Sequence, residues 1–355
     1  MKWKRAAAVL LTGALLSSVA AGCGNSIDKT AVVATLDGKE ITLGLANFMA
    51  QMSAVNYDAY LGSYYGNSMW DQDMMGDGST MTQTVQDSTI DEIEEAYLLE
   101  ANMASYDVEI TQEDLDLISN TAEEFMNENS KDAINTMGAT EEYVEEALRL
   151  YLIQLKMEDA IKAGADTEVS DDEAAQKTFS YYAISLPEED STETESVEED
   201  STEAEEESEE ALKELAEEIA ADAVDDFDGI ADKYDQTMST HSFGTQEDYF
   251  AEEVLKVADT LKEGEVSDLI TTEDGAYYVI RLDSEFDEEA TESRKSEIVT
   301  ERQNDLYSDT VQGWKDAADW SVDEDLLSQI TFGHGYTLIT EESTETESAE
   351  TESVQ

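Results

Sequence analysis

The chain has one cysteine, one proline and two histidines in 355 residues. Because Cys23 has no second cysteine to pair with, no internal disulfide can form, and stability must come from packing. His241 and His334 stand far apart and the carboxylates are spread along the chain, so no cluster shows metal-ligand spacing. There is no glycine-rich phosphate loop either. We therefore predict no metal site and no cofactor.

Basic residues are also scarce, since 19 Lys and Arg face 87 Asp and Glu, for a net charge of −68. Two tracts without basic residues, 188–210 and 341–355, carry twenty of the acids, which leaves about −48 on the rest. Such a surface repels nucleic acid and anionic lipid, so we exclude nucleic acid as a partner. The charge could also favour cationic clients or suit a saline exterior, but solubility is the interpretation that we prefer.

Long hydrophobic runs are missing, and one short run stands at the N-terminus. Lys2, Lys4 and Arg5 precede an apolar stretch over 6–16, which is shorter than the roughly 20 residues that span a bilayer. The signal ends in Val-Ala-Ala-Gly-Cys at 19–23, which resembles the lipobox that a bacterial lipoprotein signal peptidase cleaves. We predict a signal peptide over 1–22, lipidation of Cys23 and a linker over 23–30. An ordinary secretory signal with a lone cysteine at its end is the alternative.

The first half of the remaining chain reads as a hairpin followed by helices. Asp37-Gly38 between two extended runs predicts a tight turn, and Thr42 can cap a helix through Met52. We predict an irregular segment, without long helices or strands, over residues 56–88. Apolar spacings of three and four then predict helices from Thr89, after Thr111, which forms a capping box with Asp114, and from Thr140.

The pattern changes after Ser170, which caps a short helix. A buried strand is predicted over 179–186, and strands are also predicted over 269–271 and 276–282. The acidic tract 188–210 has too few apolar residues to repay the entropy of ordering, so we expect disorder there. Helices are predicted over about 212–223, 254–261 and 291–318, and the tail 334–355 is expected to be disordered.

Two segments resemble a known family. Phe227, Ile230, Tyr234 and Phe243-Gly244, followed by Leu-Lys-Glu-Gly-Glu-Val-Ser at 261–267 and the strand 276–282, resemble the second half of a parvulin-type peptidyl-prolyl isomerase. The hairpin over 34–42 and the helix starts after Thr111 and Thr140 resemble the chaperone module of SurA-like and PrsA-like extracytoplasmic foldases. The resemblance covers most of 31–332.

The resemblance implies an α+β fold with a split chaperone body. The helical module would span 31–168, an inserted parvulin-like α/β domain with a small, mostly antiparallel sheet would span 169–287, and a C-terminal helix over 288–333 would pack back on the module. The first and last strands of the parvulin-like sheet would be neighbours.

The site is where this chain departs from the family. Parvulins carry a histidine in the first strand and another in the last, and here these positions fall at Ala183, or Tyr182 if the register slips by one, and at Tyr278. Asp235 is the acidic candidate for the central loop. Ordinary strand aromatics that pack a core are the alternative for the tyrosines. The resemblance implies a proline pocket from Phe243, Tyr249, Phe250, Val254 and Leu261.

We predict a chaperone or foldase that is anchored by lipid on the outer face of the cell membrane and binds unfolded or partly folded exported polypeptides. Flexible methionines suit varied clients, and the candidates are Met49, Met52, Met69, Met74 and Met75. Two alternatives stay open. One is an active prolyl isomerase with an atypical site that contains tyrosine. The other is a non-catalytic binding or adhesive surface lipoprotein.

Overall fold

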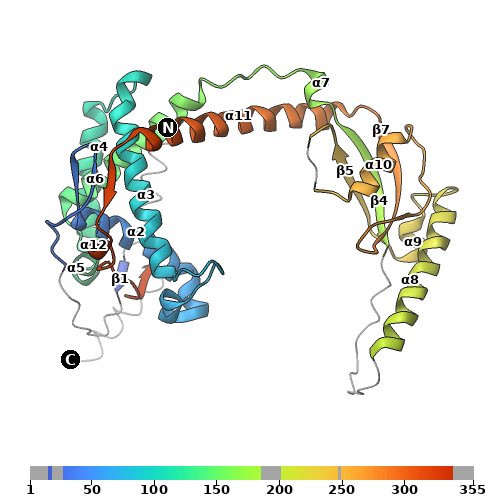
Figure 1. The fold of residues 1–355 in the computed structure, drawn as a ribbon, viewed down its shortest axis with the longest axis horizontal. Coiled ribbons are helices and arrows are strands. Elements are labelled where there is room, and N and C mark those ends of the chain that lie inside the picture. Colours follow the sequence, from blue (N-terminus) through green and yellow to red (C-terminus); the bar gives the residue numbers. More distant parts are fainter. Residues whose placement is uncertain (1–14, 18–26, 185–200, 247–248, 339–355) are drawn as a thin grey trace, which may run out of the picture. The chain divides into compact units, whose positions relative to one another are not determined.

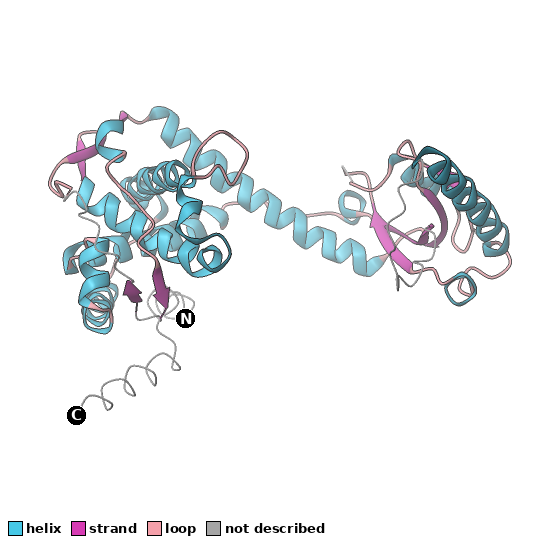
Figure 2. Cartoon of the chain, turned by 90° about the horizontal axis from the view of Figure 1, so that it is seen from below, coloured by secondary structure: helices cyan, strands magenta, loops and turns pink. Residues whose placement is uncertain are grey.

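The chain divides into two compact units, each of which is described by itself. The computed structural model describes residues 15–17, 27–184, 201–246 and 249–338. Unit 1 combines residues 1–165 with 303–355, and unit 2 spans 166–302 (Figure 1). The predicted α+β class is confirmed: unit 1 is mostly helical, and unit 2 is built on a four-stranded antiparallel sheet (Figure 2).

Unit 1 begins with the predicted hairpin. Strands β2 (Val32–Leu36) and β3 (Lys39–Thr42) pair antiparallel around Asp37 and Gly38, whose φ values of 49° and 84° are both positive. Positive φ at both central residues matches the right-handed twist of the flanking strands, as in a type I′ turn. Strand β8 (Trp320–Val322) adds to the free side of β2, with Leu36 opposite Trp320, so the sheet has the order β3-β2-β8.

The predicted helix caps of unit 1 are confirmed. Thr42 caps α2 (Leu43–Tyr65), Thr111 forms a capping box with Asp114 on α4 (Gln112–Glu128), and Thr140 caps α6 (Glu141–Lys162). Each cap satisfies a backbone N–H that has no partner inside its helix. The remaining helices of the N-terminal part are η1 (Gly66–Asp71), α3 (Met81–Asn102), η2 (Met103–Tyr106) and α5 (Lys131–Met137).

The prediction of an irregular segment over residues 56–88 is largely wrong. Helix α2 runs on to Tyr65, well beyond Met52, and ends at Gly66, whose φ is 62°. Helix α3 starts at Met81 and not at Thr89, because Thr80 and Gln83 make a reciprocal capping box. Only η1 and the residues between it and α3 lie outside these two long helices.

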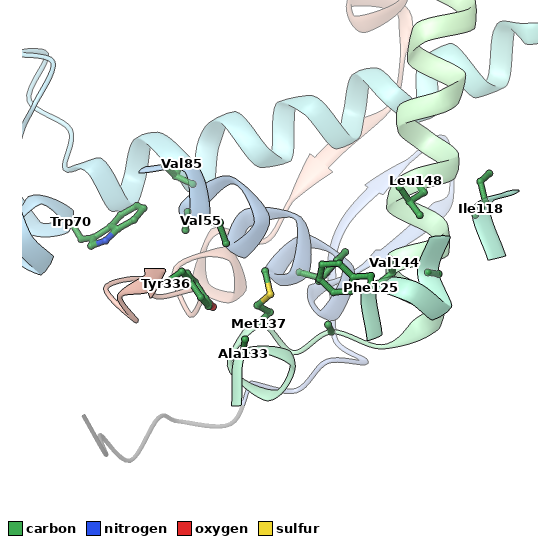
Figure 3. Packing of buried hydrophobic residues seen from close by; sticks show 14 of the residues in the cluster. Val55, Trp70, Val85, Ile118, Phe125, Ala133, Met137, Val144, Leu148 and Tyr336 are labelled. Carbon is green, nitrogen blue, oxygen red and sulfur yellow. The ribbon is translucent and has the colours of Figure 1, made fainter. Parts of the chain in front are cut away.

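The core of unit 1 is formed where α2, α3, α4, α5 and α6 meet. Figure 3 shows Phe125 of α4, Met137 of α5 and Val144 of α6 among its buried members. Phe48 and Phe125 meet edge to face with their ring centroids 6.0 Å apart. These contacts bury the apolar faces of the amphipathic helices, which is the main source of stability in a chain without disulfides.

The segment after residue 303 completes unit 1. Helix α11 (Glu288–Ala317) crosses from unit 2 into unit 1, where Tyr307 donates a hydrogen bond of 2.6 Å to Glu95 of α3. Helix α12 (Glu324–Leu327) and strand β9 (Tyr336–Leu338) follow, and β9 pairs with β1 (Leu15–Ser17). The expected disordered tail 334–355 therefore begins too early. Residues 339–355 lie outside the described residues.

Tyr336 is held in the core of unit 1 by polar contacts on both its backbone and its hydroxyl. It is 1% exposed, its N–H donates to Oδ2 of Asp58 at 3.0 Å, and its hydroxyl donates to Gln51 at 2.9 Å. Oδ1 of Asp58 accepts a second hydrogen bond of 3.0 Å from the indole of Trp70. The Asp58 carboxylate thus joins α2, η1 and β9.

The sheet of unit 2 has the order β5-β4-β7-β6, and all its pairs are antiparallel. Its strands are β4 (Lys177–Ile184), β5 (Met238–Phe243), β6 (Ile270–Thr271) and β7 (Tyr277–Ser284). Helices α8 (Ser201–Ala223) and α9 (Ile230–Tyr234) pack on one face, and α10 (Glu252–Thr260) packs on the other. The expectation that the first and last strands are neighbours is confirmed, since β4 pairs with β7.

The expected disorder over 188–210 is wrong for residues 201–210, which form the start of α8. Glutamate, which is frequent in this part of the tract, is a strong helix former, so these residues adopt a helix in spite of their charge. Residues 185–200 lie outside the described residues. Ser170 caps the short helix α7 (Asp171–Ala174), as predicted.

We predict that Asp58→Ala lowers the unfolding free energy of unit 1 by about 2–4 kcal/mol. The change leaves the buried N–H groups of Trp70 and Tyr336 without their acceptor, and an orphaned buried donor costs about 1–3 kcal/mol. Urea unfolding followed by tryptophan fluorescence measures the loss. Asp71→Ala, at an exposed position at the end of η1, is the matched control and should change stability by less than about 0.5 kcal/mol. Equal stability of the two variants would contradict the role of Asp58.

Candidate functional site

The α10 face of the unit 2 sheet carries a layer of rings that we call the aromatic floor: Phe179 and Tyr181 of β4, His241 of β5 and Tyr278 of β7. The ring of Phe250, in the segment before α10, lies over this floor. Its centroid is 5.5 Å from Phe179, 5.0 Å from Tyr181, 4.5 Å from His241 and 5.8 Å from Tyr278. Edge-on and tilted ring pairs at these separations are favourable beyond the area that they bury.

The register of the sheet decides which side chains reach the aromatic floor. Ala183 pairs directly with Tyr278, and Tyr182 pairs with Val279. Because successive side chains of a strand point to opposite faces, Ala183 shares the face of Tyr181, and Tyr182 does not. Tyr182 is fully buried under α8 and α9, and its hydroxyl donates a hydrogen bond of 3.0 Å to the carbonyl of Phe227.

Of the three residues predicted for the family's histidine positions, the structure therefore brings only two together. Ala183, which is exposed, and Tyr278, which is half-buried, lie side by side on the α10 face. Tyr182 belongs to the core on the other face, so it does not lie beside Tyr278. Asp235 lies at the end of α9 with a φ of 52°, and it is exposed on the way into β5.

The predicted pocket residues also separate into two groups. Phe243 and Val254 are buried members of the core between the sheet and α10, and Leu261 packs against that core. Phe250 lies over the aromatic floor, and Tyr249 is fully exposed, with a relative exposure of 102%. Gly244 lets the backbone after β5 pass close to the backbone before β4, since a Cβ atom at Gly244 would lie 2.6 Å from the carbonyl oxygen of Ala175.

A cavity of about 630 Å³ opens beside the aromatic floor. It is lined by His241, Gln246, Tyr249, Phe250, Arg294, Glu297 and Glu301. Arg294 binds both carboxylate oxygens of Glu301, at 2.7 and 3.1 Å, and these hydrogen bonds raise the pKa of its guanidinium. Its Nε is buried and has no hydrogen-bond partner among the described residues. The cavity thus joins an aromatic wall to a charged one.

Burial raises the pKa of the Tyr278 hydroxyl, and the nearby charge of Asp274 raises it further. The hydroxyl therefore stays protonated at neutral pH and can both donate and accept a hydrogen bond. Together, the aromatic floor, the small side chain of Ala183 and this hydroxyl can hold an apolar ring and contact a polar amide. Apart from the imidazole of His241, they supply no nucleophile and no base.

Sequence reasoning missed Tyr181 and the ion pair of Arg294. Tyr181 could have been found from the alternation of β4, because it shares the parity of Ala183. The place of His241 opposite Phe179 depends on the pairing of β4 with β5, which no local pattern announces. Arg294 lies on α11, far along the chain from Phe250, and its position became visible only in the fold.

Unit 1 contains a second, smaller hollow of about 460 Å³ between α4 and α6. Its lining combines Leu115 and Ile118 with four carboxylates and Arg149. Arg149 is already paired with Glu146 at 2.8 Å and with Glu100 at 2.6 Å. Among the described residues, no group of three or more His, Cys, Asp or Glu side chains is placed so that it could hold a metal ion, and no helix is long and apolar enough to cross a membrane.

Several solved structures are similar to this chain. A foldase protein PrsA from Lactococcus lactis has 15% identity and a TM-score of 0.33, with 85% of this chain and 100% of that chain covered. PrsA from Streptococcus pneumoniae has 20% identity and a TM-score of 0.29, covering 74% and 98%. A protein described as one of two SurA-like chaperones of Campylobacter jejuni has 13% identity and a TM-score of 0.28, covering 82% and 99%. No curated protein gave a significant match.

One family model matches a range that lies within unit 2. Residues 171–295 match the family model of the PPIC-type PPIASE domain. This range contains the whole four-stranded sheet, α8 to α10, the aromatic floor and Arg294. The predicted resemblance is thereby confirmed for this part of the chain: residues 171–295 form a parvulin-type peptidyl-prolyl isomerase domain.

Proposed function

We propose that the protein is a lipid-anchored chaperone or foldase that assists exported polypeptides outside the cytoplasm. The observation that carries the proposal is the parvulin-type domain at 171–295, inserted into a mostly helical unit that both ends of the chain build. The similar solved structures named as foldases and chaperones agree with this conclusion without carrying it. Its partners would be unfolded or partly folded polypeptides.

Exposed apolar side chains at the end of α2 support a chaperone role for unit 1. Tyr60 and Tyr64, one helical turn apart, are 77% and 82% exposed, and Tyr65 and Met75 are exposed nearby in sequence. Large exposed apolar side chains that gather on one element are typical of interaction surfaces. Of the five methionine candidates, we retain Met75, because Met69 is buried in the core and Met49, Met52 and Met74 pack against it.

The anchor is proposed from Cys23 and the segment before it. A diacylglycerol on the thiol together with an acylated amino group would give the two or more chains that stable attachment requires. The strongly acidic surface would keep the protein soluble and away from anionic headgroups. Location on the outer face of the cell membrane follows from the signal peptide that we predict over 1–22.

A second candidate function, prolyl isomerisation, is favoured by the α10 face. Isomerisation breaks no covalent bond, so it requires a surface that favours the twisted amide and not acid–base catalysis. The Tyr278 hydroxyl beside Ala183 and the aromatic floor would provide such a surface with no histidine in β4 or β7. This candidate is compatible with the chaperone role, because the two use different units.

For the chaperone role, we predict that Tyr60→Ser combined with Tyr64→Ser weakens the suppression of aggregation of a chemically unfolded protein at least about threefold. Removing two large apolar side chains takes away contact area worth about 25 cal/mol per Å². Light scattering measures the effect. The control is Val224→Ser with Phe286→Ser, two exposed apolar positions of unit 2. If the wild-type chain shows no suppression, the chaperone proposal is contradicted and a non-catalytic binding lipoprotein is favoured.

For isomerisation, we predict measurable turnover of a proline-containing peptide, lowered about tenfold by Tyr278→Phe. Loss of one hydrogen bond to the twisted amide, about 1.4 kcal/mol, accounts for this factor. Tyr277→Phe is the matched control, since Tyr277 packs on the α8 face and should leave the rate unchanged. Absence of turnover in the wild-type chain would rule out the isomerase and leave the chaperone.

For the anchor, we predict that Cys23→Ser moves the protein from the membrane fraction to the soluble fraction of the producing cells. Without the thiol there is no site for the diacylglycerol, and among the described residues no helix is long and apolar enough to cross a bilayer. Mass spectrometry of the wild-type N-terminal peptide should show the mass of the lipid on Cys23. An unmodified cysteine in that peptide would contradict lipidation and favour the ordinary secretory signal.

A further inference from the structure

Strand β9 pairs with strand β1, which the predicted cleavage of the signal peptide would remove. Leu15–Ser17 forms β1 and pairs antiparallel with Tyr336–Leu338, with Leu16 opposite Thr337. In the described part of the chain, these two strands form a sheet of their own, and β1 also lies beside α5. β1 belongs to the segment 1–22, which we predict to be cleaved as a signal peptide.

The other side of β9 is fixed to the core of unit 1. The N–H of Tyr336 donates to Asp58 of α2 at 3.0 Å, and its hydroxyl donates to Gln51 at 2.9 Å. Just before the strand, the carbonyl of Thr331 accepts a hydrogen bond of 2.9 Å from Gln51, and Phe332 stacks on Trp70 with centroids 4.6 Å apart. Figure 3 shows Tyr336 and Trp70 in this core. The strand is thus held in place without help from β1.

The direction of the backbone shows which groups face β1. In an extended strand, the N–H and C=O groups of successive residues point to opposite sides. Since the N–H of Tyr336 is directed to Asp58 on α2, the N–H and C=O of Thr337 are directed to the opposite side, toward Leu16. Once β1 is gone, these two groups form an unpaired strand edge.

An unpaired, preorganised edge is a site for strand addition. We infer that in the matured chain the β9 edge binds an extended, apolar segment of a client polypeptide, and that Leu15–Ser17 occupies this place before maturation. The chemistry of the occupant is indicated by β1 itself, since its Leu15 and Leu16 belong to the apolar run 6–16. Pairing through the backbone tolerates many sequences, as a site for varied unfolded clients requires.

The inference rests on the proposed chaperone function and on the predicted cleavage. The test uses the chain from residue 23 onward with Cys23→Ser, and a fluorescent peptide with the sequence of residues 10–18. We expect the peptide to bind, and we expect a peptide with Leu16→Pro to bind at least about tenfold more weakly, because proline removes the N–H that faces Thr337. Fluorescence anisotropy measures both.

Two protein variants sharpen the test. Thr337→Pro should weaken binding of the unmodified peptide at least about tenfold, provided that its circular dichroism and urea unfolding match the parent. The uncleaved chain of residues 1–355 with Cys23→Ser should also bind at least about tenfold more weakly, since its own β1 holds the edge. Hydrogen exchange gives a reading that needs no variant: the amide of Thr337 should be slowed when the peptide is added to the parent.

The outcomes separate this inference from the function on which it rests. Equal binding of the two peptides, or an amide of Thr337 that exchanges at the same rate with and without peptide, overturns strand addition. If the parent chain still suppresses aggregation in that case, the chaperone proposal stands and only the β9 site fails. Weaker suppression by Thr337→Pro, together with its loss of peptide binding, supports the site.

Discussion

The alternation of side chains along β4 is the constraint on which unit 2 depends. This one strand supplies both cores: Phe179 faces α10, and Tyr182 faces α8 and α9. A slip of one residue would exchange the two faces, so it would expose buried rings and leave the Tyr182 hydroxyl without the carbonyl of Phe227. The register that places Ala183 opposite Tyr278 is therefore fixed by burial on both sides of the sheet and not by any requirement of the site.

This separation of scaffold from site explains how the domain can match its family model with no histidine in β4 or β7. The fold needs apolar residues of suitable size on each face, and tyrosine and alanine satisfy that need as well as histidine does. The proposed isomerisation would depend on other atoms, namely the protonated hydroxyl of Tyr278 and the rings around Phe250. Fold and activity are thus settled by different residues, so the family match leaves the activity to be measured.

Sequence reasoning succeeded where the determining contacts are local. The Asp37-Gly38 turn and the threonine caps depend on neighbours within a few residues, and they were predicted correctly. The missed features depend on distant contacts: β8 reaches β2 through Thr35 and Ser321, 286 positions apart, and Tyr336 reaches Asp58 across 278 positions. The site shows the same difference. Ala183 and Tyr278 could be placed from the family's spacing along the chain, whereas Arg294 reaches the cavity beside Phe250 only through the fold.

The core of unit 1 needs residues from both parts of the chain that build this unit, and this determines when it can form. Its core includes Tyr336 and receives Phe332 and Trp314, so it cannot close until the last part of the chain is available. Unit 2 contains all the contacts of its own sheet within 166–302, and domains with more local contacts form faster and earlier. During synthesis the apolar faces of α2 and α3 therefore lack these partners until residues 314–336 have been made. In that interval the strong negative charge of the chain lowers the risk that these apolar faces associate with other copies.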